Sequence, residues 1–159
     1  MQPYTIYDDV MSYEQNMQVY EQTLRLPFYY GETEKGNPPT GMVFDIKDYK
    51  SDNFKFFDNI IKKVDSRCKT IGRAYINLFF SCELPYFHTD GNCITCLFYI
   101  TPKYDYDEGG ETQLLIDNNI IGIRPIPSRL LIFDGNVMHK ATSYRSKPRL
   151  TVAFKYHKE

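Results

Sequence analysis

The stretch YFHTDGNCITCLFYIT, residues 86–101, decides the fold. It places β-branched and aromatic residues, which favour strands, on either side of a break at Gly91-Asn92. From Arg73 onward, similar short apolar runs follow one another, separated by Gly, Pro, Asn and Asp. This pattern predicts strands near residues 73–80, 85–90, 93–101, 112–116, 119–124, 128–133, 137–143 and 149–156. So many short strands predict a double-stranded β-helix, the jelly-roll core of cupin-like proteins.

The segment before this region carries helical patterns instead. Ser12 and Gln15 form a predicted capping box, and apolar residues then recur on one helical face until Pro27. A second helix is expected after Ser51 or Asn53. We therefore expect a mainly β fold in one domain, residues 1–159. Residues 1–72 would supply helical support and a loop, and residues 73–156 the jelly-roll core.

Composition narrows the class of protein. The chain has 159 residues, which is typical of one domain. Its formal net charge of −1 does not argue for nucleic-acid binding, although a neutral total can still contain a local basic patch. No apolar run is long enough to span a membrane, so a cytoplasmic protein with free thiols is expected. Cys93 and Cys96 have CxxC spacing, but strand residues three apart point to opposite faces and are poor joint ligands.

Three residues are candidate metal ligands. His88 and Asp90 are two apart, and alternate residues of an extended strand share a face. His139 lies several short strands later, and a jelly roll can return that strand beside the first. Two imidazoles and one carboxylate on one side of an ion form the facial triad of non-haem Fe(II) oxygenases. The third histidine, His157, is expected to be a solvated tail residue.

An arginine at the start of the last expected strand suggests a second ligand. If Arg149 faces the barrel interior, so does Thr151, and a buried guanidinium needs an anion. Arginine grips carboxylates with two parallel hydrogen bonds, so a dicarboxylate such as 2-oxoglutarate would suit it. Tyr99 is a second candidate for that carboxylate, because a phenol can donate a hydrogen bond while its ring lines the pocket.

These residues, taken in order, resemble a known group. His88-x-Asp90, then Gly109-Gly110-Glu111-Thr112, then His139 and Arg149 look like the 2-oxoglutarate/Fe(II) oxygenases, closest to the prolyl 4-hydroxylase branch. The run CITCLFYI, residues 93–100, is similar to the strand of oxygen-sensing prolyl hydroxylases that holds a cosubstrate-binding tyrosine. The resemblance covers roughly residues 73–156 and is closest to short bacterial or phage-encoded members.

The resemblance implies a function and its cofactors. Fe(II) would be held by His88, Asp90 and His139, and 2-oxoglutarate by Arg149 with Tyr99 and Thr151. O2 would be the oxidant and ascorbate a reductant. The substrate would be a protein or peptide, hydroxylated at a prolyl residue.

Two departures bear on prolyl specificity. Lys155 stands near the position where prolyl hydroxylases carry Trp, and Asn92 where the oxygen-sensing enzymes carry Arg. Both positions are close to the substrate side in the family.

Three alternatives remain open from the sequence. A non-enzymatic cupin-like binding domain would share the barrel and the histidines without needing Arg149 or Tyr99. An oxygenase acting on nucleobases is suggested by Lys140, Arg145 and Lys147. The alternative is that these charges lie on a solvated hairpin. A purely structural interaction domain is disfavoured by the clustered triad. The loop from Gly31 to Gly41 is either a lid or a plain connector.

Overall fold

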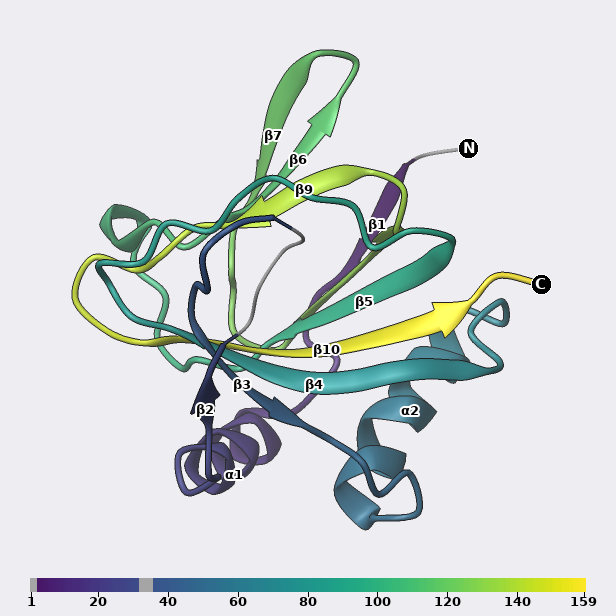
Figure 1. Ribbon diagram of the computed structural model, residues 1–159. Coiled ribbons are helices and arrows are strands. Elements are labelled where there is room, and N and C mark those ends of the chain that lie inside the picture. Colours follow the sequence, from purple (N-terminus) through teal and green to yellow (C-terminus); the bar gives the residue numbers. More distant parts are fainter. Residues whose placement is uncertain (1–2, 32–35) are drawn as a thin grey trace.

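Two antiparallel sheets face each other in the computed structural model, which describes residues 3–31 and 36–159. The larger sheet has the strand order β1-β8-β5-β10-β4-β3-β2, and the smaller has the order β7-β6-β9. Figure 1 shows both helices on the outer side of the larger sheet and the smaller sheet on its other side. The expected fold, a mainly β jelly roll supported by helices, is confirmed.

The elements follow the expected order closely. Helix α1 spans Tyr13–Thr23 and α2 spans Asp52–Val64. The strands are β1 Tyr4–Tyr7, β2 Tyr29–Tyr30, β3 Met42–Asp45, β4 Ile71–Phe79, β5 Cys93–Tyr99, β6 Thr112–Ile116, β7 Asn119–Ile123, β8 Arg129–Asp134, β9 Met138–Ala141 and β10 Arg149–His157. A single 3₁₀ turn, η1, covers Tyr106–Glu108. No helix among the described residues is long and apolar enough to cross a membrane.

Both helices begin where the sequence signals placed them. The Ser12 hydroxyl accepts a hydrogen bond from the Gln15 amide at 3.1 Å, and the Gln15 side chain accepts one from the Ser12 amide at 2.9 Å. Ser51 caps α2 in a similar way, accepting from the Phe54 amide at 3.2 Å. These side chains satisfy amide groups that the first turn of a helix leaves without partners.

One expected strand does not form. Residues 85–90 were predicted to be a strand, but within them only His88 pairs, in an isolated antiparallel bridge with His139. Pro85 has no amide hydrogen to donate to a ladder, and the Asp90 amide donates to the carbonyl of Gly135 at 2.7 Å instead. The segment is therefore fixed at separate points rather than by continuous pairing.

The alternation of side chains on the larger sheet gives it two different faces. Outward-pointing residues of β5 and β10, such as Phe98 and Phe154, pack against Phe57 and Ile61 of α2 in the main apolar core. Inward-pointing residues, among them Leu97 and Tyr99, meet residues of the smaller sheet in a second cluster. The inner face is the one that carries the candidate site residues.

The core contact between α2 and the sheet should carry much of the stability. Phe98 is fully buried, and its ring centre lies 4.8 Å from that of Phe57. We expect Phe98→Ala to lower the free energy of unfolding by about 3–5 kcal/mol, because it removes buried apolar area and leaves a cavity. Urea denaturation measures this loss. The control Ile120→Ala, at a residue 58% exposed, should change it by less than about 0.5 kcal/mol. Equal effects would contradict this assignment of the core.

Candidate metal and dicarboxylate site

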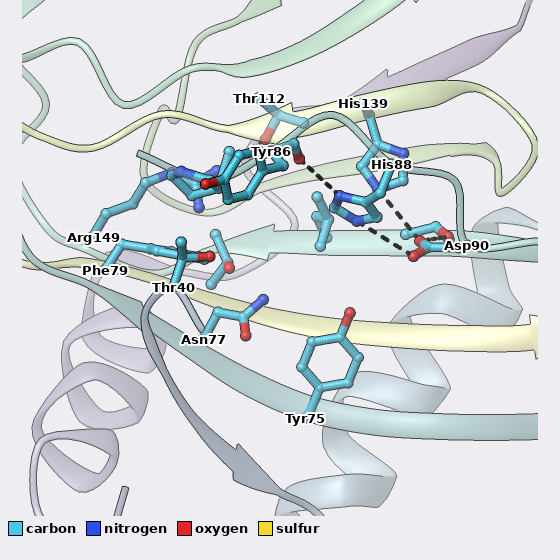
Figure 2. Close-up of a pocket in the computed structure, with 15 residues that line it drawn as sticks. Thr40, Tyr75, Asn77, Phe79, Tyr86, His88, Asp90, Thr112, His139 and Arg149 are labelled. Atoms are coloured by element: carbon cyan, nitrogen blue, oxygen red, sulfur yellow. Dashed lines mark hydrogen bonds and ion pairs between the residues drawn. The ribbon is translucent and has the colours of Figure 1, made fainter. Parts of the chain in front are cut away.

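Three side chains from distant parts of the chain converge at one end of the inner pocket (Figure 2). The Nε2 atom of His88 lies 3.7 Å from Oδ1 of Asp90, and Nε2 of His139 lies 3.5 Å from Oδ2 of the same carboxylate. One potential ligand atom from each residue lies within 4.8 Å of the others. The structure thus brings together all three residues that the sequence suggested as metal ligands.

The backbone fixes the two imidazoles. The His88 amide donates to the His139 carbonyl at 2.9 Å, and the His139 amide donates back at 2.8 Å. Each ring also turns its Nδ1 to a carbonyl two residues earlier, that of Tyr86 at 3.1 Å and that of Val137 at 2.8 Å. Such contacts select the tautomer that carries the proton on Nδ1 and leave Nε2 as the donor to a metal.

The protonation states suit a cation. Burial and the neighbouring His139 ring lower the pKa of His88, which favours the neutral form that can coordinate. Burial alone would raise the pKa of Asp90. The contacts with His139 and Lys155 outweigh this effect and hold the pKa well below its usual range. An anionic carboxylate beside two imidazole nitrogens is a donor set that fits Fe(II) and leaves coordination positions open.

Both oxygens of Asp90 have a second partner. Thr95 of β5 donates its hydroxyl to Oδ2 at 2.6 Å, and Lys155 of β10 places Nζ 2.6 Å from Oδ1. The Asp90 side chain is only 3% exposed, so these contacts hold the carboxylate in one orientation. Sequence reasoning assigned neither residue to the site, although it noted Lys155 as a departure from the prolyl hydroxylase pattern.

The other end of the pocket is built around Arg149 (Figure 2). This residue is 2% exposed, and its guanidinium donates to the Gly110 carbonyl at 2.8 Å and to the Thr112 hydroxyl at 2.9 Å. Burial lowers the pKa of Arg149, yet arginine stays charged in proteins. No carboxylate among the described residues forms an ion pair with it. A buried cation held only by neutral groups is a site for an anion.

Tyr99 and Thr112 complete this end. The Tyr99 hydroxyl donates to the Thr112 hydroxyl at 2.7 Å, and burial raises the pKa of Tyr99, so the phenol stays protonated. The Arg149 guanidinium lies 5.6 Å from the centre of the Tyr99 ring. Thr112 was not among the expected site residues, but the Gly-Gly-Glu-Thr motif was the signal that could have found it.

Gly110 permits this arrangement. Its φ is +79°, and a Cβ atom there would lie 2.3 Å from the ring of Tyr144, which is buried. Only glycine tolerates both conditions. The carbonyl of residue 110 can therefore reach Arg149.

Between its two ends the pocket has mixed walls. Thr151 lines it as expected, beside Leu97, Asn77 and Tyr75. Figure 2 shows Asn77 and Tyr75 pointing up from β4, with Asn77 toward the middle of the pocket and Tyr75 below His88 and Asp90. The Asn77 Oδ1 atom is buried and makes no hydrogen bond within the described chain. Polar atoms therefore face this space along its length.

Other candidate residues lie elsewhere. Cys93 and Cys96 are both buried and free, and the Cys96 sulfur lies 3.9 Å from that of Cys68 rather than near Cys93. His157 is exposed at the end of β10, where its amide donates to Thr70.

The basic residues after His139 do not form a row at the pocket. Arg145 donates to the Asp107 carbonyl at 3.0 Å, Lys147 donates to the Lys103 carbonyl, and Lys140 lies over the Phe87 ring.

The loop suspected of being a lid is described only in part, because residues 32–35 lie outside the described residues. On its described side, the Gly41 amide donates to Glu83 at 2.8 Å, and Tyr30 donates to the Pro39 carbonyl at 2.8 Å. Thr40 reaches the pocket wall. Closure over the site stays a prediction.

The metal assignment can be tested without any substrate. We expect Asp90→Ala to weaken Mn(II) binding by at least about tenfold, because it removes the one anionic ligand of the three. Isothermal titration calorimetry measures the affinity. Asp134→Ala removes an exposed carboxylate that pairs with Lys158, and it should leave Mn(II) binding unchanged. Undiminished binding by the Asp90 variant would contradict the assignment.

Comparison with known proteins supports the fold. No protein-family model matches the chain, and no curated protein sequence matches it. Among solved structures, a prolyl hydroxylase from Trichoplax adhaerens, in complex with a peptide fragment of the hypoxia inducible factor oxygen degradation domain, is 18% identical with a TM-score of 0.85. That match covers 99% of this chain and 84% of the other.

Two further structures extend this likeness. A Pseudomonas putida prolyl-4-hydroxylase is 12% identical with a TM-score of 0.80, and the match covers 99% and 93% of the two chains. HygX from Streptomyces hygroscopicus, with nickel, 2-oxoglutarate and hygromycin B bound, is 11% identical with a TM-score of 0.73 over 98% and 83%. At the level of the fold, the resemblance to 2-oxoglutarate/Fe(II) oxygenases is confirmed.

Proposed function

We propose that this protein is an Fe(II)- and 2-oxoglutarate-dependent dioxygenase that hydroxylates a C–H bond of a peptide, with a prolyl residue as the first candidate target. His88, Asp90 and His139 would hold the Fe(II), which would supply the activation of O2. The oxidative decarboxylation of 2-oxoglutarate would give CO2 and place one oxygen atom in succinate, and the other would go to the hydroxylated product.

The observation that carries this proposal is the pairing of two incomplete sites in one pocket. His88, Asp90 and His139 offer three ligand atoms on one side of a potential ion. Arg149, at the far end, is a buried cation for which the described residues supply no carboxylate. A dicarboxylate that reaches from the metal to Arg149 would complete both, and 2-oxoglutarate has a keto-acid end to chelate the metal.

The protein's own part in the reaction is orientation. Arg149 and the Thr112 hydroxyl would fix the distal carboxylate, and the wall of Leu97 and Thr151 would hold the carbon chain. Thr95 and Lys155 keep Asp90 in place, so its carboxylate stays grouped with the two imidazoles that would hold the metal. Pre-organised groups of this kind supply positioning while the cofactor supplies the difficult chemistry.

The peptide and the prolyl target rest on analogy. The Trichoplax structure contains a bound peptide, whereas HygX contains hygromycin B, so the fold itself admits more than one substrate class. We do not favour a nucleobase, because Arg145 and Lys147 contact the segment around η1 instead of forming a basic groove.

The decisive assay measures succinate. Purified protein with Fe(II), ascorbate, O2 and 2-oxoglutarate should form succinate slowly without substrate, and faster with a suitable proline-containing peptide. Metal binding without any succinate, with or without peptides, would favour a cupin-like binding domain instead.

Arg149 provides a sharper test. We expect Arg149→Lys to raise the KM for 2-oxoglutarate about 10- to 100-fold, because lysine keeps the charge but loses the two-pronged contact. Mn(II) affinity should stay unchanged. Arg129→Lys is the matched control, because that buried guanidinium is already paired with Asp8 at 2.7 Å and should not affect the KM. An unchanged KM in the Arg149 variant would remove this residue from the cosubstrate site.

A further inference from the structure

Beside the metal end of the pocket lies a lysine to which the proposed chemistry gives no role beyond holding Asp90. Lys155 places its Nζ 2.6 Å from Asp90, and its side chain is 19% exposed, so the ammonium group is largely shielded from solvent. In the sheet register Lys155 lies opposite Thr95 of β5 on one side and Arg73 of β4 on the other. Residues paired across strands share a face, so all three point to the inner side.

A second cleft adjoins the pocket at this point. Lys155, Arg73 and Asn92 are among its lining residues, and it shares Asp90 with the main pocket. The Arg73 guanidinium pairs with Asp45 at 2.9 Å, so its charge is balanced. His157 also lines the cleft. Lys155 is thus the cation of this cleft whose carboxylate partner, Asp90, is also the proposed metal ligand.

The charges of the loaded site do not cancel. Arg149 in the pocket and Lys155 in the adjoining cleft contribute two positive charges and Asp90 one negative charge, which leaves one positive charge. A divalent metal and the dianion of 2-oxoglutarate neutralise each other and leave that charge in place. Glu111 acts on Arg149 from outside the pocket, at the end away from Lys155. The surplus therefore belongs to the metal end.

The position of the surplus indicates where an anion would bind. A metal on Asp90 would draw on the same carboxylate charge that now balances Lys155. The ammonium group also lies 5.2 Å from the centre of the Tyr75 ring, but that contact supplies no anion. Lys155 lines this cleft, whereas Arg149 lines the main pocket, and Asp90 lines both. An anion bound at Lys155 would therefore lie beside the metal end of the pocket.

We propose that the substrate carries a carboxylate close to the C–H bond that reacts, and that Lys155 binds this carboxylate from the cleft. The inference rests on the proposed function, because the charge balance assumes bound metal and 2-oxoglutarate. The carboxylate can belong to an Asp or Glu side chain beside the target residue or to the main chain of a free amino acid. The recognition chemistry is the same in both cases.

A nucleic-acid phosphate fits these observations less well. Nucleic-acid binding uses many lysine and arginine contacts along the backbone. This cleft offers a single cation outside the Arg73–Asp45 pair, and the whole chain has a formal net charge of −1.

A binding selection tests the proposal without turnover. The full-length protein, immobilised and loaded with Mn(II) and 2-oxoglutarate, is incubated with random heptapeptides amidated at the C-terminus, and the retained peptides are sequenced by mass spectrometry. We expect Asp and Glu to be enriched. Lys155→Gln should reduce this enrichment about tenfold or more, since a close, poorly solvated charge pair is lost. Lys155→Arg should preserve it.

The matched control is Lys158→Gln, which removes a cation paired with Asp134 away from the cleft and should leave the enrichment unchanged. Displacement of the peptides by free proline but not by prolinamide would place the carboxylate on a free amino acid, and failure of both to displace them would place it on a side chain. Both outcomes support the proposal.

Three results would overturn it: no enrichment of acidic residues, equal enrichment in Lys155→Gln, or preferential retention of single-stranded oligonucleotides. A Lys155→Gln variant that loses Mn(II) affinity but keeps the acidic preference would show that the lysine only positions Asp90. Succinate formation without peptide, measured separately, tests the oxygenase itself. Succinate without an acidic preference would contradict this inference alone, whereas absence of succinate would contradict the proposed function.

Discussion

Two backbone hydrogen bonds between His88 and His139 hold the site together. They join a segment that forms no strand to the edge of the smaller sheet, and they bring two imidazoles from distant parts of the chain to one carboxylate. The candidate metal site depends on this contact, because it sets the two imidazoles side by side. The third candidate ligand, Asp90, is tied in at the same place through its amide and the Gly135 carbonyl.

The larger sheet separates stability from chemistry by the alternation of its side chains. In β10 the outward residues Leu150, Val152 and Phe154 are buried against the helices, while Arg149, Thr151 and Lys155 face inward. The apolar outer face can therefore stabilise the fold while the inner face carries charges that are expensive to bury. A one-residue slip of β10 would exchange the two faces and destroy both functions. The nine-residue pairing of β10 with its neighbours guards against such a slip.

Much of the fold could be predicted from local sequence patterns. The capping box at Ser12 and the strand that begins at Arg149 are signals within a few residues, and the structure contains both. The three candidate ligands could be grouped because the chain has few histidines and because a jelly roll returns a late strand beside an early one. The strand expected over residues 85–90 was wrong, since an extended run needs a partner that the sequence does not name.

The site residues that sequence analysis missed are brought together by the register in which the strands pair. Thr112, the first residue of β6, follows the Gly109-Gly110 turn. The position of this strand opposite the larger sheet lets Thr112 contact Arg149 and Tyr99. Thr95 and Lys155 meet at Asp90 because β5 and β10 pair in one alignment out of several that the apolar pattern would accept. Such cross-strand positions follow from tertiary packing, and neither composition nor spacing specifies them.

A crystal structure of the protein with Mn(II) and 2-oxoglutarate tests the central claim most directly. The account predicts one metal ion coordinated by Nε2 of His88, Nε2 of His139 and a single oxygen of Asp90. It also predicts the distal carboxylate of 2-oxoglutarate on the Arg149 guanidinium. A metal bound elsewhere, or a dicarboxylate that leaves Arg149 without an anion, would contradict it.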